Sequence, residues 1–448
     1  MSKLPLEGVR ILDSTYIFAM PYACAMMADL GAEVVKIEGP AHSDPIRLSG
    51  SFADNNPHPD AWNRSGGFNM LNRGKKSLTL DLSKPEGREA LKELVKVSDV
   101  LVENYTPRVM RAWGMDYPNL IKLKPDIIMV SNTGYGHGNG PWALYPAQAT
   151  TQEATHGLCH ITGYPNGIPS KAGQSYDDFL ACWSALVAVA CALRYRNKTG
   201  KGQWIDIGMY QLGCYFTSEY IMDYIANARE GGRIGNRHPW KAPQGCYPCA
   251  GKDQWCVLSV GDEAEWEALC NAMEKPALAK DPRFATAKGR MERHDELDAV
   301  ISAWTKERDR YDVMRLLQSA GVPSGVVFDL RDSNVDPHMR EHGYFERVTA
   351  PADRKLGTRV FMGRPWQLSK TKVQIKAPAP KLGEHNDYYL EKMLGYDDDK
   401  MGELEDANII GDKPLNAQRV PTVRNMEADV RNGVYAYYDP EYKQRLGL

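Results

Sequence analysis

The sequence predicts an α/β protein with a doubly wound, Rossmann-like sheet in its N-terminal third and a smaller α+β domain further along the chain. Short apolar runs alternate with amphipathic helical stretches up to about residue 134, which is typical of parallel βαβ units. A different pattern, a candidate hairpin followed by helical segments, occupies about residues 225–335. The chain has 448 residues, more than one core of usual size holds, which also favours two domains.

The first βαβ unit opens with an apolar run of strand length, GVRILD, at residues 8–13. Pro21 suits the first turn of the helix that follows, and a second strand, AEVVKIE, comes directly after it. The same rhythm returns after Ser83 and Pro85, which begin an amphipathic helix (PEGREALKELVKVS). Two further strands are then expected, DVLVENY and DIIMVSNTG.

From Asp178 the stretch DFLACWSALVAVACALRYR predicts a long apolar helix buried between layers and ended by the turn KTGKGQ. The hairpin GCYPCAGKDQWCVLSVG and three helical patterns after it mark the smaller domain. The segment KTKVQIKAPAPKLGEH is expected to be a loop on the way back to the main body. We therefore expect domains at residues 1–220 (large), 225–335 (small) and 340–448 (return to the large domain, with a C-terminal extension).

Composition excludes several classes of protein. With 43% hydrophobic residues, 25% charged residues and a net charge of −2, the chain is expected to be ordered and not to bind nucleic acid. No uncharged apolar run reaches about 18 residues and the N-terminus MSKLPLEGVR lacks the apolar part of a signal peptide, so we expect no membrane span and a cytoplasmic protein. Cys246 and Cys249 form one CxxC without a second pair, and no metal is expected.

The turn after the first strand lacks the glycines of a dinucleotide-binding fold. A pyrophosphate needs close approach of the backbone there, which glycine permits. In this chain the turn is STYIFAMP, so that Tyr16, Ile17 and Phe18 fill the space where phosphates would lie. NAD or FAD in the usual pose is therefore not expected.

Six blocks of the sequence resemble the family III CoA-transferases, the group that contains formyl-CoA and carnitine CoA-transferases. The blocks are LEGVRILDSTYIFAMPYACAMMADLGAEVVKIE, NRGKKSLTLDLSKPEGREAL, SDVLVENYTP, RYRNKTGKGQWIDIGM, GNRHPWKAPQGCYPC and LGEH. The resemblance implies a Rossmann-like large domain built from both chain ends, a small domain between them, and an interlocked dimer. It also implies coenzyme A, bound as an acyl-CoA substrate, at the turn after the first strand.

By this resemblance the nucleophile is an aspartate at the start of the long helix. It stands eighteen residues before the Arg of the turn, and counting back from Arg196 gives Asp178. A helix N-terminus stabilises a carboxylate and offers free N–H groups to an oxyanion. The alternatives are that Asp178 serves only as a helix cap or that the neighbouring Asp177 is the nucleophile.

The resemblance also implies contacts to coenzyme A. Family positions match at Ile17, Ala19, Leu80 and Asn104. The chain departs from the family at Gly39, Ser83 and Ala112, where most relatives have basic residues or, after KIE, a comparable residue. The cations expected to meet the CoA phosphates from shifted positions are Lys84, Arg108 and Arg111.

The function implied is transfer of CoA from an acyl-CoA donor to a free carboxylic acid through an aspartyl anhydride and an aspartyl-CoA thioester. One alternative is an α-methylacyl-CoA racemase-like isomerase, although Ala147 and Gln148 lie where such relatives have a GHD motif. The other is a non-catalytic CoA-binding subunit of a heteromeric transferase. The partners expected are therefore a second identical subunit or a related one.

The acceptor acid is predicted only by the apolar character of the turn. Tyr16, Phe18 and Met20 favour an aromatic or branched acid over oxalate. A substituted succinate that takes CoA from succinyl-CoA is the example we expect.

Overall fold

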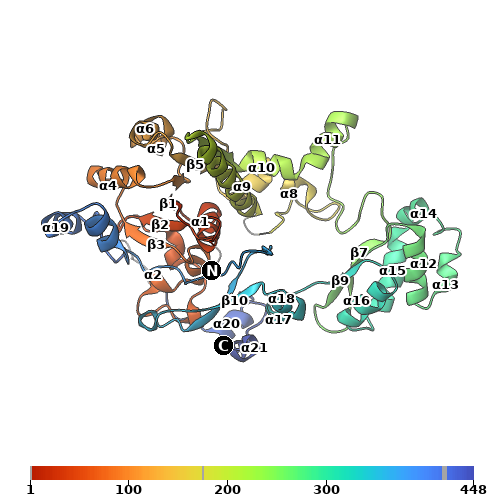
Figure 1. Cartoon of the computed structure of the whole chain (residues 1–448). Coiled ribbons are helices and arrows are strands. Elements are labelled where there is room, and N and C mark those ends of the chain that lie inside the picture. Colours follow the sequence, from red (N-terminus) through yellow and green to blue (C-terminus); the bar gives the residue numbers. More distant parts are fainter. Residues whose placement is uncertain (1–2, 174–175, 416–420) are drawn as a thin grey trace. The chain divides into compact units, whose positions relative to one another are not determined.

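The computed structural model describes residues 3–173, 176–415 and 421–448 (Figure 1). Its internal contacts divide the chain into two compact units. The large unit comprises Met1–His156, Gly173–Ile221 and Val335–Leu448, and the small unit comprises Gly157–Ala172 and Met222–Asn334. Both ends of the chain therefore belong to the large unit.

A six-stranded, all-parallel sheet forms the centre of the large unit, in the order β3-β2-β1-β4-β5-β6. Its strands are β1 (Arg10–Ser14), β2 (Glu33–Glu38), β3 (Lys76–Thr79), β4 (Val100–Glu103), β5 (Ile128–Thr133) and β6 (Trp204–Gly208). This is the strand order of dinucleotide-binding folds, in which ligands bind beyond the carboxyl ends of the strands where the order reverses, here between β1 and β4. The predicted parallel sheet is confirmed, and β6 is a strand that the sequence patterns did not predict.

One face of the sheet is covered by α1 (Ala19–Asp29) and α9 (Tyr176–Thr199), as Figure 1 shows. Every residue of α1 is buried, because its small alanine and cysteine side chains allow close packing. The long helix α9 exists as predicted, but it is not buried on all sides within one chain. Residues at helical spacing, among them Ala181, Ala185 and Val189, pack in the core, whereas Val187 on the opposite face is 65% exposed.

The other face carries α4 (Pro85–Lys96), α6 (Tyr117–Leu123), the π-helical segment Tyr388–Met393 and α19 (Asp398–Asp406). The C-terminal residues Tyr389, Leu390 and Leu404 share one core cluster with the sheet. Residues near position 385 also cover the edge of β3: the Thr79 N–H donates to Asn386 Oδ1 at 2.8 Å. The second face is thus completed by the last fifth of the chain.

The small unit holds an antiparallel sheet, β7 (Gln244–Pro248), β8 (Trp255–Ser259) and β9 (Ser324–Val326), with β8 in the middle. Its core is formed with α12 (Glu263–Ala272), α15 (His294–Thr305) and α16 (Arg310–Ser319). The predicted hairpin and the three predicted helices are therefore present. Two short helices complete this unit's helical layer, α13 (Pro276–Ala279) and α14 (Ala287–Glu292).

After α17 (Leu330–Val335) and α18 (Pro337–Glu341) the chain forms a hairpin, β10 (Phe345–Thr349) and β11 (Thr358–Met362), in the large unit. The C-terminal extension, defined here as residues 421–448, contains α20 (Met426–Arg431) and α21 (Tyr442–Leu446). The other short helices are η1 (Pro45–Leu48), η2 (Ala53–Asn55), α2 (Ala61–Arg64), α3 (Gly66–Leu71), α5 (Arg108–Ala112), α7 (Ala149–Thr155), α8 (Leu158–Ile161), α10 (Met209–Phe216), α11 (Ser218–Asn227) and η3 (Ala352–Arg354). Within the described residues, α9 alone has the length and composition of a membrane span, a test that core helices also pass.

Candidate active site

The start of α9 brings two adjacent aspartates to the face of the sheet that α1 covers. Both Asp177 and Asp178 lie in the first turn, where N–H groups have no partners within the helix. The Tyr176 N–H donates to Glu153 Oε1 at 3.0 Å, and Glu153 is fully buried. This end of α9 is therefore anchored by a carboxylate from α7.

The two aspartates differ in their surroundings. Asp177 is completely buried, and its two carboxylate oxygens lie 3.2 and 3.1 Å from Nε2 of His156, which is equally buried. Gly213 of α10 permits this packing, since a Cβ there would lie 2.1 Å from Cδ2 of His156. Asp177 is therefore held in an internal pair and cannot be reached from solvent.

Asp178 is half-buried, in contrast to Asp177. It lies close enough to Cys182, one helical turn away, for its charge to add to the effect of burial in raising the pKa of that thiol. The neighbouring Phe179 ring packs edge to face against Phe18 at 5.1 Å, and Tyr22 lies 6.1 Å from the same ring. The structure thus brings Asp178 beside the turn after β1.

That turn has an unusual backbone conformation. Ile17 has a φ of +73°, which is strained for a β-branched residue, and its side chain is 48% exposed. The Tyr16 N–H donates to Asn104 Oδ1 and the Asn104 amide returns a bond to the Tyr16 carbonyl, both at 2.9 Å. The Ile17 N–H donates to both oxygens of Asp44, at 3.1 and 3.2 Å. Side chains from two other segments therefore hold the strained turn in place.

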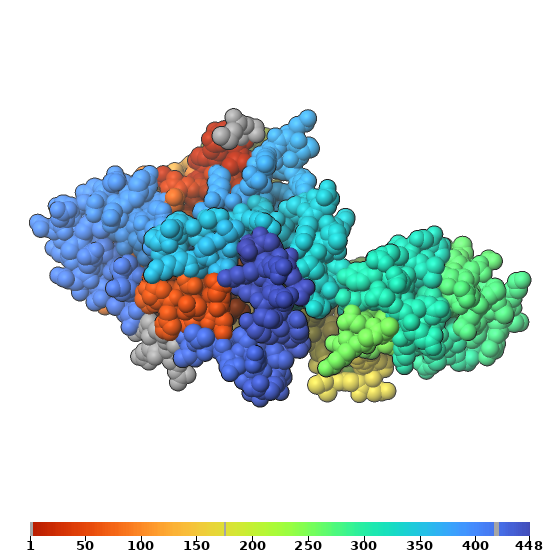
Figure 2. All heavy atoms as spheres, turned by 90° about the horizontal axis from the view of Figure 1, so that it is seen from below, coloured from red at the N-terminus to blue at the C-terminus, as the bar shows by residue number. Residues whose placement is uncertain are grey.

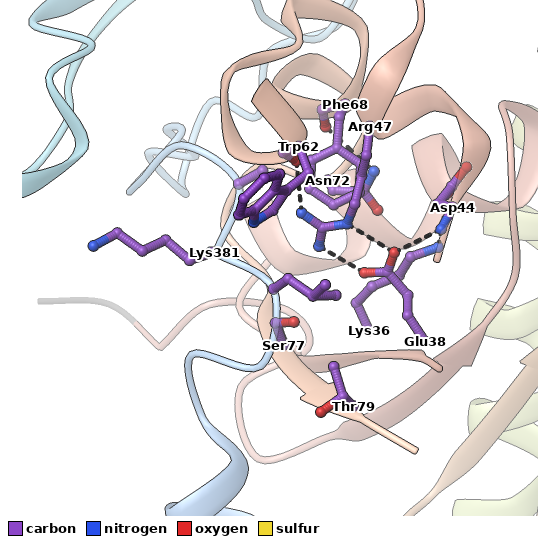
Figure 3. A network of polar contacts seen from close by, with 12 residues as sticks. Lys36, Glu38, Asp44, Arg47, Trp62, Phe68, Asn72, Ser77, Thr79 and Lys381 are labelled. Carbon is purple, nitrogen blue, oxygen red and sulfur yellow. Dashed lines mark hydrogen bonds and ion pairs between the residues drawn. The ribbon is translucent and has the colours of Figure 1, made fainter. Parts of the chain in front are cut away.

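A buried network of charges lies behind the turn (Figure 3). Lys36 Nζ lies 3.0 Å from Asp44 Oδ2, and Arg47 Nη2 lies 2.6 Å from Glu38 Oε2, with all four side chains fully buried. The Asp44 N–H donates to Glu38 Oε1, which joins the two pairs. Although burial opposes it, the Arg47 charge lowers the pKa of Glu38 to about 2. The network fixes Asp44 and, through it, Ile17.

The predicted CoA contacts do not all lie at this turn. Ile17 and Ala19 do, and Asn104 shapes the turn through its backbone bonds. Leu80 is fully buried in the core on the opposite face, and its N–H donates to the Glu38 carbonyl at 2.7 Å. Gly39 stands where a Cβ would lie 3.1 Å from Cα of Asp81, so close packing explains why this chain has glycine there.

The three predicted cations follow the carboxyl ends of two strands. Lys84 precedes α4, after β3, and both Arg108 and Arg111 lie on α5, after β4. All three side chains are exposed, and the described residues give none of them an ion-pair partner within 4 Å. Arg108 and Arg111 follow β4, the strand adjacent to β1, whereas Lys84 follows β3, which is two strands from β1.

Sequence patterns missed a second polar group at the carboxyl ends of β4, β5 and β6. Glu103 is 1% exposed, and burial raises its pKa to about 7. One oxygen accepts the Tyr105 N–H at 2.9 Å, and the other has no hydrogen-bond partner in the described part of the chain. Nearby, His137 Nδ1 lies 3.0 Å from Asp206 Oδ1. The sequence feature that could have pointed to Glu103 is its position at the carboxyl end of a buried strand.

No cluster of three or more His, Cys, Asp or Glu side chains suited to a metal ion occurs among residues 3–173, 176–415 and 421–448. The reactive group at the candidate site is the half-buried carboxylate of Asp178, at the start of α9. Aromatic rings and the rigid turn after β1 lie beside it.

Comparison with known proteins identifies relatives across most of the chain. The sequence model of CoA-transferase family III matches residues 6–386. A succinyl-CoA–D-citramalate CoA-transferase from Chloroflexus aurantiacus is 32% identical over 91% of this chain and 98% of its own length. The β subunit of a succinyl-CoA–L-malate CoA-transferase from the same organism is 29% identical over 91% of this chain and 98% of its own length. A solved structure of a CaiB/BaiF family protein from Brucella suis has a TM-score of 0.79 and 29% identity, covering 87% of this chain and all of that one.

Proposed function

The chain belongs to CoA-transferase family III and is a CoA-transferase, and from this premise we propose that Asp178 carries the transferred groups covalently. The observation that supports Asp178 is its contrast with Asp177. Both lie in the first turn of α9, but Asp177 is sealed against His156 whereas Asp178 is half-buried beside Phe179 and the turn after β1. An aspartate must be accessible to attack a bound thioester.

The proposed reaction begins when an Asp178 carboxylate oxygen attacks the thioester carbonyl of the donor. The C–S bond breaks, which gives a mixed anhydride and CoA thiolate. The thiolate attacks the Asp178 carbonyl carbon and releases the donor acid, leaving an aspartyl-CoA thioester. The acceptor carboxylate then displaces the thiolate to form a second anhydride, and attack of the thiolate on its acyl carbon gives the new acyl-CoA and restores Asp178. Atoms and charges balance without a metal or an oxidant.

The turn supplies two features that this route needs. Its fixed backbone, held by Asn104 and Asp44, gives the CoA thiol end a constant position through several steps. The rings of Phe18, Tyr22 and Phe179 give the anhydrides an apolar surrounding that disfavours hydrolysis. Arg108, Arg111 and Lys84 are proposed to meet the CoA phosphates at the rim.

We propose succinyl-CoA as donor and a substituted succinate as acceptor. Two relatives are named for succinyl-CoA and for D-citramalate or L-malate, both of which are succinates with substituents at C2. The aromatic rings beside Asp178 favour an acceptor with an apolar substituent, aromatic or branched, over a small polar one. A panel of succinates with methyl, hydroxyl and aryl substituents, assayed with succinyl-CoA, would rank these acceptors.

The His156 and Asp177 pair does not support the racemase alternative. A racemase needs a base and an acid that reach the α-carbon of a bound substrate. Both side chains are fully buried and face each other, so that neither meets solvent or a ligand.

The test compares Asp178→Asn with Asp177→Asn in a CoA-exchange assay. We expect Asp178→Asn to lose about 10³-fold or more in kcat with an unchanged melting temperature, because only the nucleophile is removed. Asp177→Asn should instead lower the melting temperature while keeping measurable activity. Hydroxylamine added with acyl-CoA should inactivate the natural enzyme by converting Asp178 into a hydroxamate, and mass spectrometry should find no such modification in Asp178→Asn. Full activity of Asp178→Asn would refute the assignment.

We further propose that the transferase works as a dimer. The outer face of α9 and α10 exposes large apolar side chains, including Val187, Tyr195 and Tyr215, the last 83% exposed. An apolar surface of this kind is typical of a subunit interface. Light scattering after gel filtration should give twice the chain mass of 50.2 kDa. A monomer would contradict this, and a chain inactive alone but active with a related subunit would favour a heterodimer.

A further inference from the structure

A cavity of about 950 Å³ lies in the large unit beneath the C-terminal extension. Its walls come from the segment around residues 48–70, from the β10–β11 hairpin and from residues 421–443. Figure 2 shows the extension, in dark blue, packed beside the orange atoms of the first of these segments. The family match ends at residue 386, so one wall of this cavity is made by a part of the chain outside that match. The lining does not include Asp178, Phe18 or Phe179.

The extension is held over the cavity by specific contacts. Asp54 forms ion pairs with Lys443 at 2.7 Å and with Arg359 at 2.5 Å, and the Tyr442 hydroxyl donates to it. Asn55 Nδ2 donates to the Arg424 carbonyl at 2.6 Å. These contacts hold the C-terminal extension over the cavity. The volume of the cavity lies within the range of small-molecule sites.

Arg64 lines this cavity and is 5% exposed. Its guanidinium donates to three backbone carbonyls, from Nε to Asn56 and from Nη1 to Arg354 and Lys355. In the described part of the chain no hydrogen bond uses its Nη2 atom and no carboxylate lies within 4 Å of it. Burial lowers the pKa of Arg64, although the more distant charges of Asp54 and Asp60 act in the opposite direction.

Arg64 differs in this respect from the other buried arginines among the described residues. Each of those has a carboxylate partner: the pairs are Arg47–Glu38, Arg73–Asp29, Arg290–Glu263, Arg310–Asp332 and Arg364–Asp29. A buried charge without compensation is costly, and an anion arriving from outside would provide the missing partner. Arg359 also lines the cavity, and its Nε is a buried donor without a hydrogen-bond partner in the described part of the chain.

The other residues that line the cavity are mainly apolar and indicate the character of the rest of the ligand. One face of the β10–β11 hairpin presents Val348, Ala350 and Phe361, and Phe52 and Met70 contribute from the opposite segment. Asp54 is paired with two cations, Lys443 and Arg359, and Arg424 with Asp429, so the charged groups at the cavity carry an excess of positive charge. Arg64 is the cation among them without a carboxylate within 4 Å in the described residues, and its apolar surroundings suit a carboxylate on an apolar body better than a polyphosphate.

We propose that this cavity binds a small apolar carboxylic acid, aryl or alkyl, whose carboxylate pairs with Arg64. The site is separate from Asp178, and the inference does not depend on the proposed catalytic route. Binding there is expected to stabilise the docked extension, because the ligand joins it to the body of the large unit.

Isothermal titration of the full-length protein with 4-phenylbutyrate tests the proposal, with 4-phenylbutanamide as the neutral analogue of the same shape. We expect the acid to bind and the amide to bind about tenfold or more weakly. Arg64→Gln should weaken binding of the acid by a similar factor, whereas Arg315→Gln, which removes an exposed cation from the small unit, should leave it unchanged. Ala350→Phe, which fills the cavity without removing a charge, should abolish binding.

Equal binding of acid and amide would overturn the proposal, as would unchanged binding of the acid to a folded Ala350→Phe protein. Absence of binding at millimolar acid would overturn it as well. Should Arg64→Gln fail to fold, the amide and Ala350→Phe still decide. Because titration needs no turnover, loss of binding here and failure of CoA exchange in Asp178→Asn are separate results.

Discussion

Two regions at the carboxyl edge of the same sheet treat buried charge in opposite ways. At the β2 side, Lys36 and Glu38 of the strand are paired with Asp44 and Arg47, which follow it, and all four side chains are fully buried. At the end of β4, Glu103 is almost as deeply buried but has no cation within ion-pair distance among the described residues. The paired side holds a strained turn rigidly, whereas the unpaired acid is left to change its protonation state near neutral pH. The comparison shows that charge pairs near β2 hold the turn after β1 rigid, whereas the acid that titrates near neutral pH is on a different strand, β4, of the same sheet.

The largest effect is expected from Asp44→Asn. It removes the carboxylate paired with Lys36, leaving only the more distant Asp13 and Glu38 to offset the buried charge, and it weakens the hold on the Ile17 N–H. We therefore expect a loss of about 3–5 kcal/mol in the free energy of unfolding, measured by urea unfolding. The double variant Lys36→Met with Asp44→Leu should recover part of that loss, because neither member of this pair then leaves its partner's charge buried. A loss under about 1 kcal/mol for Asp44→Asn would mean that the paired side is not rigidified by its charges.

Glu103 should make stability depend on pH. Its folded pKa, raised by burial to about 7 from 4.5, means that the folded state holds a proton which the unfolded state releases. The contribution of Glu103 to stability is therefore fully present below about pH 4.5 and is lost as pH rises through about 7, by on the order of 3 kcal/mol. His137 and Asp206 face the same carboxyl with opposite effects on its pKa.

Unfolding of the natural protein and of Glu103→Gln at several pH values would check this dependence. The Gln variant should lose this component of the pH dependence and be the more stable protein above neutral pH. If the free energy of unfolding depended on pH in the same way in both proteins, Glu103 would not titrate as proposed, and its contrast with the paired charges near β2 would not hold.

A smaller effect is expected at the turn itself. Ile17→Gly relieves the positive φ at a half-exposed side chain and should stabilise the fold by about 1 kcal/mol. The freed backbone should at the same time raise KM for acyl-CoA. Ile17→Ala keeps the strain and serves as the control in thermal unfolding. Destabilisation by Ile17→Gly, greater than that by Ile17→Ala, would show that the turn is held by the side chain.

The smallest effect concerns a paired charge that is not buried. Although partial burial opposes it, contacts with Lys443, Tyr442 and Arg359 lower the pKa of Asp54 to about 2. This carboxyl is about one-third exposed, so Asp54→Asn should cost about 1 kcal/mol or less. Limited proteolysis should nevertheless cut the C-terminal extension faster in the variant, with Asp312→Asn as an exposed-pair control. Equal cleavage rates would show that Asp54 does not hold the extension.

Much of the fold was predictable because buried parallel strands are apolar runs and their helices are amphipathic. The strands at residues 10–14 and 33–38 and the helix from Pro85 followed from local patterns alone. The strand Trp204–Gly208 was missed because it is short and mostly partly exposed, and so resembles a continuation of the preceding turn. The C-terminal helices were missed because their stability comes from contacts with Asp54 and Asn55, far away in sequence.

The site was predictable only in part, for a related reason. Spacing relative to Arg196 singled out Asp178, but the sequence did not separate it from Asp177. That distinction depends on His156, twenty-one residues away, whose burial against Asp177 no local pattern encodes. The strained φ of Ile17 was equally hidden, since isoleucine is not the residue that a positive φ favours.

The covering of β3 and of one sheet face by residues 383–411 has a consequence for biosynthesis. Ser77 and Thr79 find their edge partners in His385, Asn386 and Gly411, more than 300 positions later. While the ribosome is still making that stretch, the strand edge and the apolar surface above it are bare, and both invite intermolecular association. The nascent chain is therefore most exposed to association in the interval before its closing segment emerges.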